Sequence, residues 1–441
     1  MSTNSQLTPQ SAGQYRLGGP RAWWIWVIVT VFTIYLFNVQ TMFSVVQGDI
    51  KSSLHLDDSH LTMIAATYTW AFAIFQFFGG AFLDCFGSRK VLIPAFIFVA
   101  AGVFLYGIAT TYSMILVAQV LMALGACCGF VGAGYVGGVW FGMAAYGTMF
   151  GYVQVLSSLS SAIQQPITEK ILTALSYEKL FVYLGFFGIL LVVLAVLYMR
   201  NPTPVTTHKS PFKVVGHNLL QIIKMPQMWI AALWGGIAFG LNLALGVVWT
   251  PKIFTNADFT LANGNVGSAL LWLGLAAGSC FWPKWSDRIH SRRIPSMIGV
   301  AMMLIGLVAV VYVDMPLWLM YVMMFVIGMG ATSHMLAFTI GGDVAGGPLV
   351  GTSSAFLNGI MFIFGGILQN IPSNLQSNGA GMHTMFLPFI VAAGIALIFV
   401  FIQKENTLWF RFMTSESFTS ISGFSDRHFK IIISHTMNFC N

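Results

Sequence analysis

Long apolar runs follow one another along most of the chain, and they decide what it can fold into. A helix needs about 20 apolar residues to cross the hydrocarbon core of a bilayer. Cutting the sequence at charges, prolines and glycine clusters leaves twelve such runs, at roughly 22–47, 61–83, 91–110, 113–140, 148–171, 180–199, 227–252, 264–286, 295–313, 316–342, 350–371 and 383–402. These runs predict an all-α polytopic membrane protein with 12 transmembrane helices.

The composition excludes the main soluble classes. Charged residues make up 7% of the 441 positions, whereas soluble proteins carry about 25%. Hydrophobic residues reach 57%, more than one soluble core could bury. The five cysteines have neither the spacing of a metal site nor that of an extracellular disulfide framework. We therefore expect an integral membrane protein with no cofactor, no metal and no nucleic-acid partner, and not an enzyme.

The basic residues are distributed unevenly between the segments that join the runs. If the N-terminus is cytoplasmic, sixteen of the twenty lie in cytoplasmic segments and four lie outside. Cytoplasmic loops of membrane proteins carry an excess of Lys and Arg, and here they would face the anionic headgroups of the lipid bilayer. The sequence therefore predicts cytoplasmic N- and C-termini and, in a bacterium, the cytoplasmic (inner) membrane. The four outer residues are Lys51, Lys170, Lys179 and Lys252.

The runs divide into two halves that repeat each other. We expect a cytoplasmic segment at 1–21, six-helix bundles at 22–199 and 227–402, a hydrophilic linker at 200–226 and a disordered cytoplasmic tail at 403–441. A shift of about 204 residues superposes polar residues that are rare in such a sequence. The pairs are Asn38 with Asn242, Gly147-Thr148 with Gly351-Thr352, Gln154 with Asn358, and Gln165 with Gln369. We interpret the halves as two pseudo-symmetric bundles related by duplication.

A short polar loop follows the second run and has a partial copy after the eighth. The first loop reads Gly80-Ala-Phe-Leu-Asp84-Cys-Phe-Gly87-Ser-Arg89-Lys90. The second keeps Asp287, Arg292 and Arg293 but has Pro283 and His290 where the glycines stand. The first loop resembles the signature of the major facilitator superfamily (MFS). That resemblance, over residues 22 to about 402, implies a central cavity that opens alternately to each side.

The same resemblance implies gating roles for the loop residues. They are Asp84, Arg89, Lys90, Asp287, Arg292 and Arg293. A carboxylate beside an arginine at the start of a helix forms a contact that can break and form again. The alternative for the basic residues is that they only enforce topology, as the positive-inside rule requires.

Polar side chains inside the runs are the candidates for solute contact, because a polar group facing lipid is costly. Our candidates are Asn38, Gln154, Asn242, Asn358, Tyr68 and Trp70. The alternative for each is a hydrogen bond that only joins two helices. His334 is the one histidine well inside a run, and it could carry a coupling proton or simply bond to a neighbouring helix.

These features favour a secondary active transporter that works by alternating access. No Lys or Arg lies at mid-run, so we expect a small neutral or zwitterionic solute, amino acid-like, sugar-like or nucleoside-like, taken up with protons. One chain supplies both halves of the pathway, which favours a monomer. The alternatives are a non-transporting sensor or scaffold, and a uniporter or exporter of the same fold.

Overall fold

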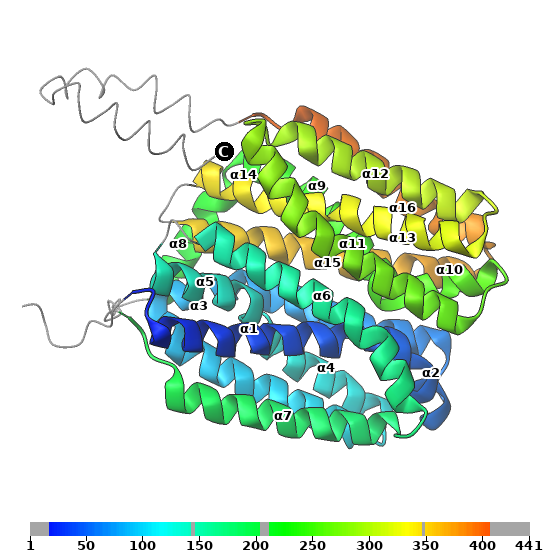
Figure 1. Ribbon diagram of the computed structural model, residues 1–441, viewed down its shortest axis with the longest axis horizontal. Coiled ribbons are helices and arrows are strands. Elements are labelled where there is room, and N and C mark those ends of the chain that lie inside the picture. Colours follow the sequence, from blue (N-terminus) through cyan, green and yellow to red (C-terminus); the bar gives the residue numbers. More distant parts are fainter. Residues whose placement is uncertain (1–16, 143–145, 203–210, 346–348, 406–441) are drawn as a thin grey trace, which may run out of the picture. The chain divides into compact units, whose positions relative to one another are not determined.

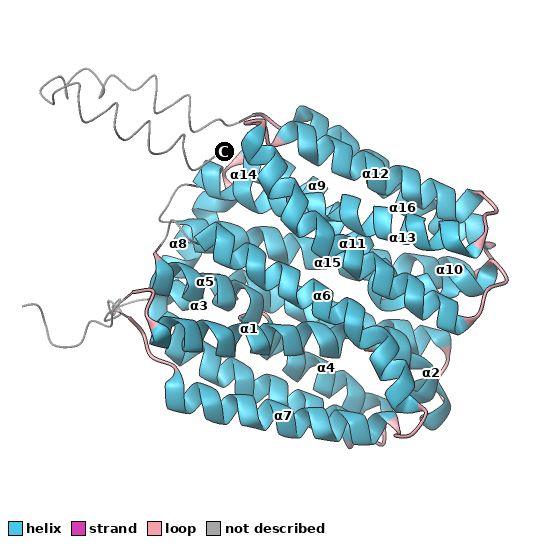
Figure 2. Ribbon diagram, viewed as in Figure 1, coloured by secondary structure: helices cyan, strands magenta, loops and turns pink. Residues whose placement is uncertain are grey.

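The computed structural model describes residues 17–142, 146–202, 211–345 and 349–405, and the regular elements in these ranges are helices (Figure 2). In the first half they are α1 (Pro20–Thr41), α2 (Phe43–Ser53), α3 (Asp58–Gly107), α4 (Tyr112–Ala126), α5 (Gly129–Phe141), α6 (Tyr146–Leu172) and α7 (Tyr177–Tyr198). The linker holds α8 (Pro211–Ile223). The second half has α9 (Pro226–Ala244), η2 (Leu245–Trp249), α10 (Thr250–Asn256), α11 (Leu261–Arg288), α12 (Arg293–Tyr312), α13 (Leu317–Ala331), η3 (Thr332–His334), α14 (Met335–Ala345), α15 (Val350–Ser377) and α16 (Met382–Ile402).

The helices follow the twelve predicted runs to within several residues, and the fold class is confirmed. Within the described ranges, eleven helical stretches are long and apolar enough to cross a membrane. The twelfth span is α6, which corresponds to the run predicted at 148–171. Figure 1 shows the helices of the first half, blue to green, on one side and those of the second half, green to red, on the other. The halves meet mainly along α3 with α15 and along α6 with α11.

Helix α6 is less apolar than the other spans because one of its faces is buried in protein. Polar residues at three- and four-residue spacing lie on the buried face, namely Gln154, Ser157, Ser158, Ser161, Gln165 and Thr168. Apolar residues at the same spacing are exposed on the other face, namely Leu156, Leu159, Ile163, Ile167 and Ile171. A membrane helix with this pattern faces lipid with its apolar side and other helices with its polar side.

Four of the spans are broken near mid-length, and the breaks are symmetric. The first span is interrupted at Met42, between α1 and α2, and the seventh has a π-helical turn at η2. The fourth is interrupted at Cys127 and Cys128, and the tenth at η3. The same shift of 204 residues carries Met42 into η2 and Cys128 into η3. Irregular backbone at membrane depth is tolerated where it is buried in protein or lines a cavity, so the breaks indicate where to look for a site.

The two signature loops share one backbone feature. Gly87 has a φ of +76° at the turn inside α3, and His290 has a φ of +52° at the matching place between α11 and α12. A left-handed φ costs a histidine more than a glycine. The second loop therefore keeps a positive φ at the matching position although its sequence has lost the glycine. We call the end of the helices that carries Gly87, His290 and α8 the linker end, and the other end the far end.

The linker was predicted as a hydrophilic segment without a helix, but it contains helix α8. Its apolar residues Val214, Val215 and Leu219 pack against Ala81 and Cys85 of α3, together with Phe86. Helix α8 also contacts α9 and α15. Part of the linker, the first sixteen residues and residues 406–441 of the tail lie outside the described residues.

Candidate functional site

A narrow cavity, with room for about one water molecule, lies between the two halves and next to the helix breaks. Most of its walls are aromatic, and its polar groups come from α1, α3, α6, η3 and α15. The lining residues are Leu36, Phe37, Gln40, Tyr68, Phe72, Ala126, Phe130, Gln154, Phe239, His334, Phe338, Asn358 and Phe362. The cavity thus brings together four of the sequence candidates, including Gln154 and Asn358, which occupy matching positions in the two halves.

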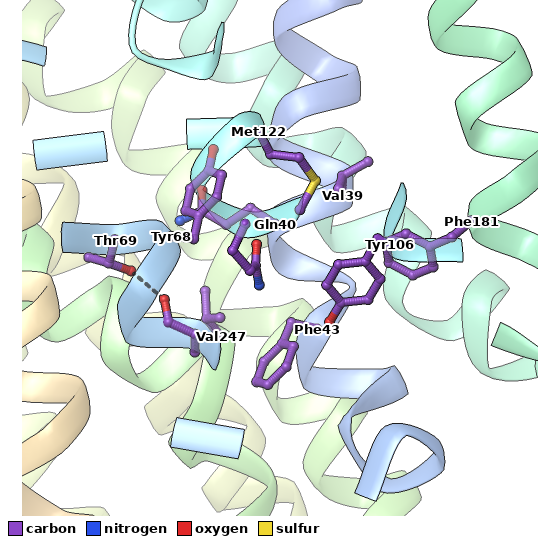
Figure 3. Close-up of a pocket in the computed structure, with 11 residues that line it drawn as sticks. Val39, Gln40, Phe43, Tyr68, Thr69, Tyr106, Met122, Phe181 and Val247 are labelled. Atoms are coloured by element: carbon purple, nitrogen blue, oxygen red, sulfur yellow. Dashed lines mark hydrogen bonds between the residues drawn. The ribbon is translucent and has the colours of Figure 1, made fainter. Parts of the chain in front are cut away.

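A second cavity of similar, narrow size adjoins the first through Gln40 and Tyr68. It lies within the first half, with Val247 of η2 as its contact to the second half. Figure 3 shows the amide of Gln40 in the space between Tyr68, Tyr106 and Phe43. Gln40 and Tyr68 therefore face both cavities.

The amide groups of the central cavity have hydrogen-bonding capacity left over. Gln154 donates from Nε2 to Ser158 Oγ at 2.8 Å, one turn along α6. The Nε2 atom of Gln40 and the Nδ2 atom of Asn358 are buried and have no hydrogen-bond partner in the described part of the chain. Buried polar groups are normally paired, so these two amides are positioned to bind water or a solute.

His334 lies in η3 and is 1% exposed. Its Nδ1 atom lies 2.9 Å from the carbonyl oxygen of Ala331, an acceptor, so the neutral ring carries its proton on Nδ1. The Phe239 ring lies beside the imidazole, with 4.9 Å between the ring centroids. The residue lines the cavity, and Nε2 is the nitrogen of the neutral ring that can accept a hydrogen bond.

Aromatic pairs join the two halves around this cavity. The rings of Phe72 and Phe362 stack with centroids 3.8 Å apart, and those of Phe150 and Phe338 meet edge to face at 5.8 Å. Each pair has one member in each half. These contacts carry no hydrogen bonds, so they can separate without leaving a buried polar group unpaired.

The linker end is closed by close contact between α3 and α15. A Cβ atom on Gly80 would lie 2.8 Å from the carbonyl oxygen of Gly351 and 2.9 Å from the Ala355 Cβ. The rings of Phe77 and Phe356 meet nearby, with centroids 6.0 Å apart. The two helices can approach this closely only because Gly80 has no side chain.

Toward the far end, one hydrogen bond joins the two halves, and a second one, within the second half, holds the same glutamine; sequence reasoning singled out neither. Thr69 Oγ1 of α3 donates to Gln369 Oε1 of α15 at 2.9 Å. The indole Nε1 of Trp249 donates to the Gln369 carbonyl oxygen at 3.0 Å. Gln369 was visible as the counterpart of Gln165, but Gln165 bonds within its own half, to Ser44 at 3.0 Å.

Three of the predicted solute contacts lie away from the two cavities. The side-chain amide of Asn38 exchanges hydrogen bonds with Ser160 Oγ at 2.8 and 3.0 Å, which matches the alternative of a bond between helices. Asn242 is 0% exposed, and neither of its amide atoms has a partner among the described residues. Trp70 is 37% exposed and lies against Gly366 of α15, so its ring faces away from the centre.

The predicted gating residues lie at the linker end. Asp287 and Arg292 form an ion pair within their own loop, and the Arg293 guanidinium lies over the Phe401 ring at 4.8 Å. The side chains of Arg89 and Lys90 are exposed. The side chain of Asp84 lies outside the described part of the structure.

The sequence signal for Gln40 was present but ambiguous. Asn38 and Gln40 are two positions apart, which separates them by about 200° around a helix. Only one of them can face the cavity, and in the structure it is Gln40, whereas the match of Asn38 with Asn242 favoured Asn38. The aromatic walls carried no sequence signal, because phenylalanine is common in every span.

Comparison with known proteins agrees with this architecture. A profile described as Major Facilitator Superfamily matches residues 27–370. The chain is 21% identical over 412 residues to the uncharacterized transporter YybO of Bacillus subtilis, which covers 86% of this chain and 92% of YybO. It is 22% identical over 274 residues to the probable sulfoacetate transporter SauU of Cupriavidus necator, covering 59% of this chain and 63% of SauU.

Two further similarities concern a sugar-acid transporter and a solved structure. The chain is 23% identical over 241 residues to the probable galactarate/D-glucarate transporter GudP of Escherichia coli, covering 50% of this chain and 53% of GudP. The crystal structure of a bacterial homolog of the human lysosomal transporter Spinster, inward-facing and unoccupied, matches with a TM-score of 0.66 and 15% identity. That match covers 89% of this chain and 98% of the homolog, and it shows the fold.

The profile match extends from α1 into α15 and so includes both halves of the cavity. The helices that it spans carry the twofold repeat, the symmetric breaks and the signature loop. This chain belongs to the major facilitator superfamily.

Proposed function

We propose that the protein is a secondary active transporter that binds a small neutral or zwitterionic solute in the central cavity and takes it up by alternating access. That it is a membrane transporter agrees with the names of its relatives. The observation that carries the proposal is the placement of Gln154 and Asn358, matching residues of the two halves, in one cavity between them. In transporters built from repeats, the solute binds near the bilayer midplane where the repeats meet.

The cavity walls favour a solute with an apolar body and a few polar atoms. Seven aromatic residues line the cavity, beside three amides and one histidine. Apolar walls with a few placed polar groups are typical of small-molecule sites. Among the three solute types we expect, an amino acid with an apolar side chain or a nucleoside fits this lining better than a sugar.

The names of the relatives raise a second candidate, a small organic anion. Sulfoacetate and galactarate or D-glucarate are anions, but no Lys or Arg lines the cavity in this chain. A buried anion needs a compensating charge. His334 could supply one only in its protonated form, so an anion would have to enter together with a proton.

His334 is our proposed coupling residue. It lies in the same cavity as Asn358, and its Nε2 atom is left to accept a proton or a hydrogen bond from the solute. A histidine held by one nitrogen and open at the other can bind a proton on one side of the membrane and release it on the other.

Opening and closing would occur at the two ends of the α3 and α15 contact. We propose that the contact of Gly80 with Gly351 closes the linker end, and that the Thr69 to Gln369 hydrogen bond closes the far end. The charged residues of the two loops would shift the equilibrium between the closed and open linker end; they are Asp84, Arg89, Lys90, Asp287, Arg292 and Arg293. By the distribution of basic residues, we propose that this end is cytoplasmic and that a bacterial cell would carry the protein in its inner membrane.

The experiment uses purified protein in proteoliposomes that contain a pH-sensitive dye. Pools of amino acids, nucleosides, sugars and small organic acids are added outside in turn. Acidification of the lumen by one pool supports proton-coupled uptake, and its loss in His334→Ala supports the coupling role. If no pool changes the pH of the lumen, the next assay is counterflow of labelled solutes, which detects a uniporter or an exchanger. Absence of counterflow as well would contradict transport and favour a sensor or scaffold.

A further inference from the structure

A large apolar groove lies on the outside of the first half, apart from the central cavity. It is open on one side and lies between the two arms of α3 and the break that joins α4 to α5. Two of its residues, Phe78 and Phe98, are 43% and 39% exposed. Its lining residues are Phe75, Phe78, Phe82, Phe86, Lys90, Val91, Pro94, Ala95, Phe98, Leu124, Cys127 and Cys128.

The spacing of phenylalanines in α3 creates one wall of the groove. Phe75, Phe78, Phe82 and Phe86 recur every three or four residues, which places them in one stripe along the helix. The ring centroids of Phe78 and Phe82 are 6.2 Å apart, and those of Phe82 and Phe86 are 6.0 Å apart. The stripe points toward the linker end, where α3 turns at Gly87.

The floor of the groove is the helix break between α4 and α5. A Cβ atom on Gly79 would lie 2.9 Å from the carbonyl oxygen of Cys127, so α3 lies directly on the break. The thiols of Cys127 and Cys128 are 3.7 Å apart and line the floor. Because both thiols are buried, the floor offers no charge to a ligand.

The single charged group of the lining is Lys90, at the linker end of the groove. It follows the Gly87 turn, and its side chain is exposed. Among the described residues its ammonium group takes part in no ion pair. A long apolar channel with one cation at the membrane surface is complementary to a molecule that has a chain and an anionic head.

We propose that this groove binds an anionic phospholipid, with an acyl chain along the phenylalanine stripe and the phosphate at Lys90. The helices that form the groove cross the membrane, so hydrocarbon rather than water covers the stripe. Any phospholipid could fill the apolar part, but a headgroup with a net negative charge gains most from Lys90, because the phosphate of a zwitterionic headgroup already has its own cation beside it. Basic pockets between transmembrane helices at a membrane surface bind anionic headgroups in this way.

The position of the groove connects such a lipid to the linker end. Phe75 to Phe86 precede the Gly87 turn, and Lys90 to Phe98 follow it. The first arm also carries Gly80, whose contact with α15 closes the linker end. A lipid that contacts both arms would hold the turn in the geometry seen here.

The test is native mass spectrometry of the purified protein, titrated with phosphatidylglycerol or phosphatidylcholine of identical acyl chains. We expect the anionic lipid to bind about fivefold more tightly, as one lysine near the surface allows. Lys90→Gln should bring the two lipids to equal affinity. Lys224→Gln is the matched control, because Lys224 is another exposed lysine of the linker end that does not line the groove, and it should keep the preference.

A second variant tests the groove itself. Val91→Trp fills part of the lining without removing the charge, and it should weaken binding of both lipids. Equal binding of the two lipids by the unmodified protein would overturn the proposal. So would a preference that persists in Lys90→Gln, a preference lost equally in Lys224→Gln, or anionic-lipid binding unchanged in Val91→Trp. Elution of each variant at the position of the parent protein in size-exclusion chromatography controls for folding.

Discussion

Alanine at Gly80 should open the linker end of the transporter. The added methyl would lie 2.8 Å from a backbone oxygen of α15 and 2.9 Å from the Ala355 Cβ, and neither atom belongs to a flexible side chain. Overpacking of this kind costs about 1–3 kcal/mol. When α3 and α15 separate, the methyl has no such contact and the cost disappears. The gain of helix propensity from glycine to alanine is the same in both states, so it does not affect their ratio.

That cost should shift the population toward the state with an open linker end by a factor of about 5 to 150. The assay is pulsed electron–electron double resonance, which measures the distance between two spin labels. The labels are attached at Tyr198→Cys and Ile294→Cys in a background without other cysteines. Both sites are exposed, at 54% and 51%, and lie at the linker end of the two halves. The control is Gly394→Ala, because a Cβ there has no neighbour within 4 Å. Identical distance distributions in Gly80→Ala and the control would show that the Gly80 contact does not hold the linker end closed.

Three further predictions concern the far end, the cavity and the membrane surface. Thr69→Val removes the hydrogen bond to Gln369, so it should favour opening of the far end by about 0.5–1.5 kcal/mol, measured by spin-label distances at that end. Asn358→Leu should weaken solute binding in a titration by about five- to a hundredfold, because a buried partner is lost; unchanged affinity would place the solute elsewhere. The backbone N–H of His60, followed by the Ser59 hydroxyl, lowers the pKa of Asp57 to about 2. The ionised Asp57 side chain caps the N-terminus of α3, so it stabilises the helix fully above about pH 4 and less as the pH falls toward 2. Asp57→Ala should therefore flatten the thermal-stability profile between these pH values.

The twelve spans could be predicted because each depends on local composition alone. A run of apolar residues has one way to satisfy its backbone in lipid, as a helix. Span α6 was found in the same way, although Ser157 and Gln165 make it the most polar of the set. The bounds of the two predicted bundles depend on the same reasoning and stay a prediction.

The site was only partly predictable, because side-chain direction depends on packing. Gln154 and Asn358 were found from the repeat, which is a property of the sequence. Asn38 and Gln40 are both polar and two positions apart, and only the packing of α1 against α6 shows which one turns inward. Trp70 lies two positions from Tyr68 and faces the opposite side for the same geometric reason.

Backbone conformation was the other part that the sequence did not reveal. His290 adopts a left-handed φ where the first half uses Gly87; histidine is enriched among the non-glycine residues that do so, but such residues are too few for the sequence to predict one here. The break at η3, which carries His334, was also not predicted, because Thr332 and Ser333 lie inside an apolar run with no proline nearby to mark a break.

Labelling of the central cavity from each side of the membrane is the direct test of a solute site between the two halves. The protein with Ala126→Cys as its only cysteine, a lining position that supplies no polar contact to the solute, is reconstituted in one orientation and treated with a membrane-impermeant maleimide from either side, with and without the transported solute. We predict labelling from both sides, because the cavity opens to each in turn, and slower labelling when solute occupies the cavity. Labelling from neither side, or a rate that solute does not change, would contradict a solute site between the two halves.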